Sequence, residues 1–94
     1  MALFKIAATG AFSRTLKKLS KKHPEVVAVY ETVLGVLQVD PLNQSLRHDI
    51  KKLSGVPAGD GQWRIRIGDY RLRYDVEGET VILWSINDRK DAYR

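Results

Sequence analysis

The sequence lacks cysteine entirely, so its 94 residues can form no disulfide and no thiolate metal site. A reducing cytoplasm suits such a chain. Long apolar runs are also missing, since none approaches the roughly 18 residues of a membrane span. The first residues, MALFKIAATGAF, lack the basic-then-apolar order of a signal peptide. We therefore expect a cytoplasmic protein without a membrane partner.

Acidic residues are in short supply, because 11 Asp and Glu stand against 16 Lys and Arg and leave a net charge of +5 at pH 7. This excess favours polyanions or an acidic protein as partners, without choosing between them. With 44% hydrophobic residues, the chain can bury a core of its own. We expect a single domain over residues 1–94.

Groups for metal and acid–base chemistry are scarce as well. The two histidines, His23 and His48, are far apart in the sequence and give little support to a metal cluster or a Ser-His-Asp arrangement. The glycines Gly55, Gly59 and Gly61 precede a strand and lack the lysine and hydroxyl of a nucleotide-binding loop. We expect no metal and no cofactor.

What the chain does contain is a strict alternation over 62–76, QWRIRIGDYRLRYDV. A two-residue turn at Gly68-Asp69 predicts a hairpin with one apolar face. In the pairing set by that turn, the core face holds Trp63, Ile65, Ile67, Tyr70, Leu72 and Tyr74.

The other face of this hairpin carries four arginines. Arg66 is expected across from Arg71, and Arg64 across from Arg73. Like charges directly opposite one another destabilise a sheet, by a few tenths to about 1 kcal/mol per pair. Four guanidinium groups on one rigid patch therefore point to a polyanion, with nucleic-acid phosphates the usual ligand. A basic but inert strand face, relieved by a carboxylate such as Asp75, stays open at this point.

Ahead of the hairpin, residues 3–6 predict a strand and two helices follow it. Thr9 or Ser13 can cap the first helix, whose apolar residues repeat at helical spacing. Pro24 suits the first position of the second helix, which ends before Asp40. The solvent side of the first helix is basic, which fits a solvated face or a second RNA-binding surface of Lys17, Lys18 and Lys21.

Three later segments complete the predicted fold. Residues 51–53 predict an edge strand, where Lys51 and Lys52 would join Arg73 in contacting RNA. The stretch 81–86, VILWSI, is apolar on both faces and predicts a central strand covered on both sides. We expect an α+β fold: an N-terminal strand, an antiparallel αα-hairpin on one face of a mostly antiparallel sheet of about four strands, and a short C-terminal helical turn.

The order of these elements, with KKLSG, the RIRIGDYRLRYDV hairpin and the closing VILWSINDRKDAYR, resembles the RelE/ParE superfamily of bacterial toxins from type II toxin–antitoxin systems. The resemblance covers essentially the whole chain. Many relatives have a histidine where this chain has Asp88, which leaves the proton carrier open. Carried over position by position, the resemblance implies catalytic roles for Arg64, Arg66, Arg71, Arg89 and Tyr93.

The superfamily holds two activities, ribosome-dependent mRNA cleavage and gyrase poisoning. The arginines favour the first, because attack by the substrate's own 2′-hydroxyl needs in-line geometry and charge stabilisation rather than a metal. Arginine is not deprotonated in proteins, so protons would be carried by Tyr93, Asp88 or a ribosomal group. A gyrase inhibitor without nuclease activity and an inactive, antitoxin-bound regulator stay as alternatives. The resemblance implies a cognate antitoxin, mRNA on the ribosome, and operator DNA reached through the antitoxin as partners.

Overall fold

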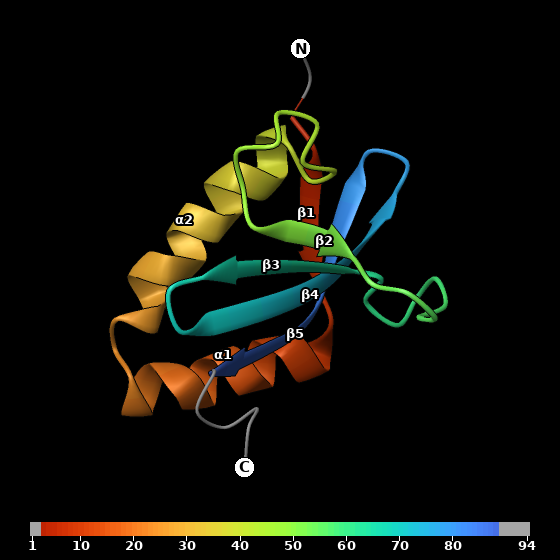
Figure 1. Cartoon of the computed structure of the whole chain (residues 1–94). Coiled ribbons are helices and arrows are strands. Elements are labelled where there is room, and N and C mark those ends of the chain that lie inside the picture. The colour runs from red at the N-terminus through yellow and green to blue at the C-terminus, as the bar shows by residue number, and fades with distance from the viewer. Residues whose placement is uncertain (1–2, 89–94) are drawn as a thin grey trace.

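A computed structural model describes residues 3–88 of the chain. Two helices pack on one face of a five-stranded sheet whose strand order is β1-β5-β4-β3-β2 (Figure 1). β1 runs parallel to β5, and every other pair of neighbours is antiparallel. The elements are β1 (Lys5–Ala8), α1 (Gly10–Lys22), α2 (Val26–Val39), β2 (Ile50–Lys52), β3 (Trp63–Ile67), β4 (Tyr70–Glu77) and β5 (Thr80–Asp88).

This arrangement confirms the expected α+β architecture, with one strand more than the predicted four. The sheet is larger because both short edge segments pair: β1 adds to β5 and β2 adds to β3. The addition of β1 also makes the sheet mixed, because β1 pairs with β5 in parallel while the other neighbours are antiparallel. The predicted C-terminal helical turn lies outside the described residues.

The two helices are positioned by their ends and by their apolar faces. Thr9 caps α1, and its Oγ1 accepts a hydrogen bond from the N–H of Phe12 at 3.0 Å. α2 begins at Val26 rather than at Pro24, because residues 24 and 25 form a turn in which the N–H of Val26 donates to the carbonyl of His23 at 2.9 Å. The helices diverge from this connection instead of lying side by side (Figure 1), since α1 packs on β5 while α2 reaches β1 and β3.

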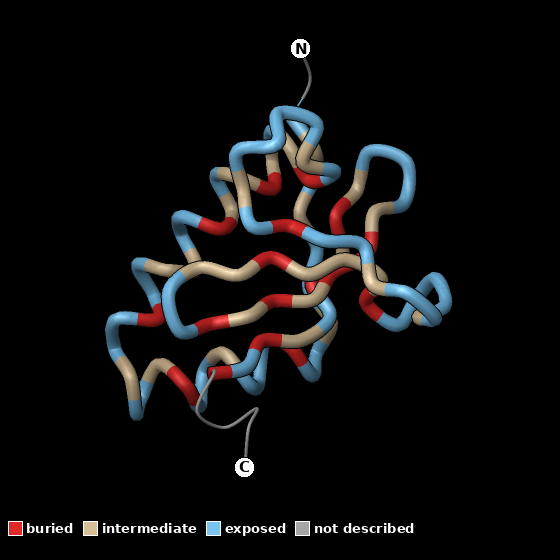
Figure 2. Tube along the Cα trace, in the orientation of Figure 1, coloured by how far each residue is buried: buried red, intermediate tan, exposed pale blue. Residues whose placement is uncertain are grey.

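The central hairpin has the predicted register. Its turn is Gly68-Asp69, and the residue pairs run from Ile67↔Tyr70 to Trp63↔Tyr74. Figure 2 shows buried positions alternating with less buried ones along β4, and a single buried position, Ile65, on β3. The fully or partly buried side chains of this face join Phe12, Val33 and Leu37 from the helices in one core.

β5 lies between β1 and β4, as a central strand should. A β-bulge interrupts its alternation, because Arg73 pairs with Ser85 while its neighbour Tyr74 pairs with Leu83. On the side away from the helices, Trp84 remains 38% exposed. Within residues 3–88, β5 is therefore fully covered on one face only, and the cover expected from the C-terminal residues falls outside the described part. Its core-facing side chains are Val81, Leu83 and Ile86.

Candidate nucleic-acid interface

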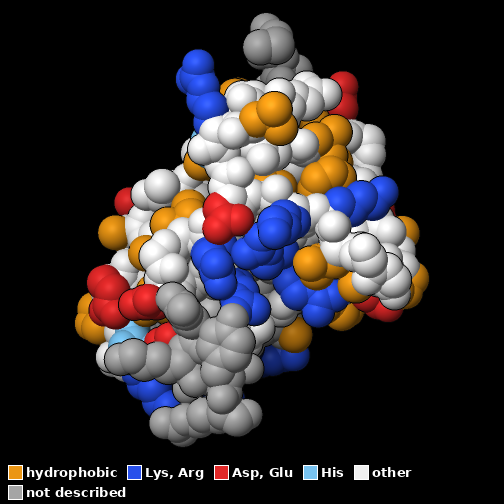
Figure 3. Space-filling view, in the orientation of Figure 1, with side chains coloured by type: hydrophobic (Ala, Val, Ile, Leu, Met, Phe, Trp, Pro, Cys, Tyr) orange, Lys and Arg blue, Asp and Glu red, His pale blue; other side chains and the backbone are white. Residues whose placement is uncertain are grey.

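Four arginines lie on the side of the sheet that the helices leave open, and we call this surface the arginine face. The strand pairing sets Arg66 against Arg71 and Arg64 against Arg73. Lys51 on β2 extends the row, because it pairs with Arg64. Figure 3 shows basic side chains gathered in the middle of this surface, over the strands. The sequence prediction of two opposed arginine pairs is confirmed.

The arginine face is hollowed at its centre by a cavity of about 320 Å³. Asn87 brings β5 into this site, because it is the residue paired with Arg71 on the second side of β4. Its amide adds a donor and an acceptor to a group of pure donors. Sequence reasoning missed Asn87, although counting back along an antiparallel partner of β4 would have pointed to it. The cavity is lined by Leu53, Arg64, Arg71, Arg73 and Asn87.

The arginines differ in what holds them inside the protein. Nη2 of Arg64 lies 3.0 Å from Oδ1 of Asp49, and only 13% of the Arg64 side chain is exposed. Asp49 itself is 47% exposed, so this ion pair is open to competition from water, salt or a phosphate. The guanidinium of Arg66 makes no hydrogen bond or ion pair within residues 3–88. Within the described part of the chain, Arg66 is thus held against Arg71 without a counter-charge of its own.

Arg73 is instead held by a loop that crosses the open side of the sheet. Its Nε donates to the carbonyl of Gly61 at 3.1 Å and its Nη2 to the carbonyl of Asp60 at 2.7 Å. The buried carboxylate of Asp75 on β4 binds the backbone of the same loop. It accepts hydrogen bonds from the backbone N–H groups of Gly59, Gly61 and Gln62, at 3.2, 2.9 and 3.0 Å.

These contacts settle the role of Asp75. The inert-face alternative used this carboxylate to neutralise the arginines, but its two oxygens are engaged by the loop's N–H groups instead. The carboxylate turns those N–H groups inward, which leaves the loop's carbonyls to hold Arg73. The carboxylate that forms an ion pair with Arg64 of this face is that of Asp49, in the loop before β2.

Among the described residues that line the cavity, none can act as a base at neutral pH, since they are three arginines, an asparagine and a leucine. Asp88, one of the expected proton carriers, is buried, and its Oδ2 lies 3.5 Å from Nε2 of His23 on the side of the helices. Its position opposite Tyr70, a core residue, explains why it points away from the arginine face. The expectation that Asp88 could serve this site is therefore wrong.

Tyr70, a tyrosine of the core, is equally unsuited to proton transfer. Burial raises the pKa of Tyr70 to about 12, and its hydrogen bond to Glu25 at 3.1 Å adds to the shift. Within residues 3–88, no group of three or more His, Asp or Glu side chains is arranged to hold a metal ion. The described helices also include none long and apolar enough to cross a membrane.

Comparison with known sequences identifies the family. Residues 6–93 match the family described as "ParE toxin of type II toxin-antitoxin system, parDE". The chain belongs to this family. Over 48 residues it is 40% identical to Toxin RelE3 of Methanocaldococcus jannaschii, a match that covers 51% of this chain and 51% of that protein. The chain thus spans about half the length of the curated relative it matches.

Solved structures with the same fold extend over nearly the whole chain of this toxin-family member. The RelBE2 toxin–antitoxin complex of Mycobacterium tuberculosis gives a TM-score of 0.62 at 26% identity, covering 93% of this chain and 99% of that one. The RelB–RelE complex of Methanococcus jannaschii gives 0.60 at 25%, covering 93% and 94%. The RelE–RelB complex of Pyrococcus horikoshii, at 0.61 and 23% over 93% and 96%, shows the shared fold alone. The resemblance to the RelE/ParE superfamily is confirmed.

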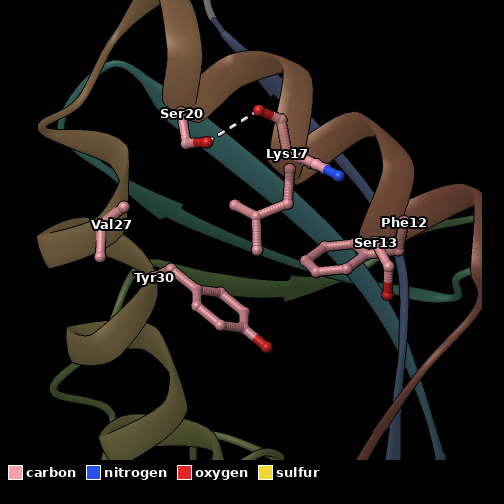
Figure 4. A pocket seen from close by; sticks show the side chains of 7 residues that line it. Phe12, Ser13, Lys17, Ser20, Val27 and Tyr30 are labelled. Carbon is pink, nitrogen blue, oxygen red and sulfur yellow. Dashed lines mark hydrogen bonds between the residues drawn. The ribbon is translucent and has the colours of Figure 1, made fainter.

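Not all the predicted RNA-binding residues of this toxin-family chain come together. Lys52 pairs with Trp63 on the core side of the hairpin, where its Nζ lies 5.9 Å from the ring centroid. Lys17 lines a groove of about 280 Å³ between α1 and α2, next to the rings of Phe12 and Tyr30 (Figure 4). Arg89 and Tyr93 lie outside the described residues. Lys18 and Lys21 also belong to α1, away from the arginine face.

Proposed function

We propose that this toxin is a ribosome-dependent mRNA endonuclease. One observation carries the proposal: Arg64, Arg71 and Arg73 line a single cavity of about 320 Å³ on an open strand face. A cavity of this kind suits a phosphate group, because guanidinium groups bind phosphate oxygens through several parallel hydrogen bonds. The opposed pair Arg66 and Arg71 supports the same reading, since it places like charges together where a neutral pair would favour folding.

The proposed reaction is attack of the substrate's 2′-hydroxyl oxygen on the adjacent phosphorus. The 2′ oxygen–phosphorus bond forms, the phosphorus–5′ oxygen bond breaks, and the products are a 2′,3′-cyclic phosphate and a 5′-hydroxyl. Arg64, Arg66, Arg71 and Arg89 would stabilise the extra negative charge of the pentavalent phosphate. The 2′-hydroxyl has to lose a proton and the 5′ oxygen has to gain one. Arginine does neither, so Tyr93 or a ribosomal group would carry these protons.

The proposed dependence on the ribosome follows from the shortage of acid–base groups among the described residues of the site. A site that supplies positive charge but no base accelerates cleavage only when another component, here the ribosome, positions the mRNA with its 2′-hydroxyl in line with the scissile bond. We therefore expect mRNA on the ribosome to be the substrate and free RNA to be cleaved poorly. Such a protein would act in the cytoplasm.

A cognate antitoxin is the expected protein partner. The solved neighbours from Mycobacterium tuberculosis and Methanococcus jannaschii are toxin–antitoxin complexes. The positive arginine face and the apolar groove between α1 and α2 would each suit a small antitoxin with acidic or amphipathic segments. Operator DNA would be reached through that antitoxin.

A reconstituted translation system tests the nuclease proposal. Purified toxin is added to a message with and without ribosomes, and the RNA ends are analysed. We expect cleavage only when ribosomes translate the message, with 2′,3′-cyclic phosphate and 5′-hydroxyl ends. Efficient cleavage of free RNA, or 5′-phosphate ends, would contradict the proposed chemistry.

Gyrase inhibition is the second candidate, and the family match favours it, because the matching family is described as a ParE toxin. A non-enzymatic inhibitor would need no proton carrier, which fits the cavity lining equally well. Supercoiling by purified gyrase in the presence of the toxin distinguishes the two. Under the nuclease proposal gyrase activity is unchanged at toxin concentrations that cleave translated mRNA.

A further inference from the structure

Trp84 is a large aromatic side chain that the proposed chemistry leaves unused. It belongs to the β-bulge of β5, beside Ser85, the residue that pairs with Arg73. It is 38% exposed, on the side of the sheet away from the helices. Trp63, the second tryptophan of the chain, lies instead on the core side of the hairpin. A partly exposed indole next to a cluster of arginines would suit a ligand that has both an apolar face and negative charge.

The loop that holds Arg73 also supports the indole ring. Gly61 has a φ of +77°, and a Cβ at this position would lie 2.8 Å from Cδ1 of Trp84 and 3.0 Å from Cβ of Arg73. Only glycine lets the backbone approach the ring this closely. Because the N–H of Gly61 is bound by Asp75 and its carbonyl by Arg73, the loop is tied at the point where it meets the ring. The indole is thus fixed beside the arginine face before any ligand arrives.

We infer that Trp84 is a stacking platform for a nucleobase of single-stranded RNA whose phosphate occupies the cavity of Arg64, Arg71 and Arg73. This rests on the proposed function and assigns a base-binding position to the same site. Single-stranded RNA is commonly held by a basic groove that follows the backbone and by aromatic rings that stack on the bases. Stacking of this kind tolerates any base, because every base has a π face. Trp84 therefore adds affinity and positions the strand rather than choosing a sequence.

Charge favours RNA over a protein as the ligand at this position. Arg73 adjoins the ring through Gly61, and the basic row continues to Arg64 and Lys51 across the sheet. An antitoxin segment bound at Trp84 would have to place acidic groups over this row. A nucleotide meets both demands at once, with the base on the ring and the phosphate on the arginines.

Tryptophan fluorescence gives a direct test, because Trp63→Phe leaves Trp84 as the only tryptophan in the chain. The probes are a short oligoadenylate and an oligonucleotide of the same length that lacks bases. We expect the oligoadenylate to quench Trp84 and the abasic strand to leave its emission unchanged. We expect Trp84→Leu to weaken oligoadenylate binding by roughly fivefold to 100-fold and Trp84→Phe to restore most of the loss.

A double-mutant-type cycle, which combines removal of the bases from the oligonucleotide with Trp84→Leu in the protein, separates stacking from a structural effect. Removing the bases should weaken binding to the wild-type toxin by the same factor as Trp84→Leu, and should cause no further loss in the Trp84→Leu protein. Leu46→Ser is the matched control, because Leu46 is an apolar residue 85% exposed in the loop that follows α2. It should leave oligoadenylate affinity unchanged.

The outcomes distinguish this inference from the proposed function. Salt-sensitive binding that is unchanged in Trp84→Leu would overturn the platform and leave the phosphate site intact. Failure of the wild-type toxin to bind oligoadenylate at low salt would overturn both. Unchanged oligoadenylate affinity with loss of antitoxin co-purification in Trp84→Leu would assign the ring to a protein contact and overturn the platform.

Discussion

Replacing the arginines of the open face one at a time should separate folding from RNA binding, because the protein holds each of them differently. The contrast is sharpest between Arg66 and Arg73. The guanidinium of Arg66 makes no hydrogen bond or ion pair within residues 3–88, and it faces the like charge of Arg71. Arg73 donates two hydrogen bonds to loop carbonyls, at 3.1 and 2.7 Å.

The magnitudes follow from these contacts. Arg66→Thr removes a like-charge pair and adds a good strand former, so stability should stay constant or rise by up to about 1 kcal/mol. Arg73→Gln loses hydrogen bonds from a charged donor, one of them partly buried, which costs about 2 kcal/mol. In a domain of this size, about 1 kcal/mol moves Tm by about 4–8 °C. Arg73→Gln should therefore melt about 8–16 °C lower, while Arg66→Thr melts at or slightly above the wild-type temperature.

Arg64→Gln provides the intermediate case. It loses an ion pair whose acid, Asp49, is largely exposed, so the expected cost is about 0.2–1 kcal/mol. All three variants should bind single-stranded RNA more weakly than the wild type, because each removes one phosphate contact. Thermal unfolding by circular dichroism and RNA binding by fluorescence anisotropy measure the two effects. The reasoning is refuted if Arg66→Thr melts as low as Arg73→Gln, or if it stays folded and binds RNA as tightly as the wild type.

Three other measurements probe the same structure. Single-stranded RNA binding should show a slope of log K against log salt of roughly −2 to −3, as three or four phosphate contacts give at about −0.7 each; salt-independent binding would count against the phosphate site. Asp75→Asn should cost at least about 2 kcal/mol, because the amide cannot accept from three N–H donors as the buried carboxylate does; an unchanged Tm would show that the loop is held by other means. The hydrogen bond from Ser45 lowers the pKa of Asp40, so its contribution is complete above the ordinary carboxyl pKa of about 4 and is lost as pH falls through the lowered value. The difference in unfolding free energy between wild type and Asp40→Asn should thus be constant near neutral pH and shrink below about pH 4; a difference that persists in acid would contradict this.

The sequence was sufficient wherever a local rule decides the structure. The two-residue turn at Gly68-Asp69 and strict alternation determine the hairpin register, so both arginine pairs were predicted correctly. Thr9 or Ser13 was predicted as the cap of α1 by the same kind of local rule, and the structure shows that Thr9 is the cap. The turn and the alternation alone determine which side of the sheet each hairpin residue occupies.

Features that depend on distant segments could not be read in this way. The partner of Arg64 is Asp49, which comes from the loop before β2, and the partner of Asp75 is a loop of glycines that alternation does not describe. The β-bulge at Trp84 breaks the period of β5, which alternation alone does not predict. The expected cover for the second face of β5 comes from residues outside the described part and stays a prediction. Asp88 was considered as a proton carrier because it stands where many relatives have a histidine, whereas the strand period after the bulge places it opposite Tyr70 and near His23.

The most direct test of the central claim follows messages in cells after induction of the toxin without its antitoxin. Primer extension maps the 5′ ends of translated messages for the wild type and for Arg66→Thr, with melting temperatures confirming that both proteins are folded. The proposed function predicts cleavages within translated regions for the wild type and strongly reduced cleavage for Arg66→Thr. Intact messages together with a rise in covalent gyrase–DNA complexes would contradict it and assign the toxin to gyrase.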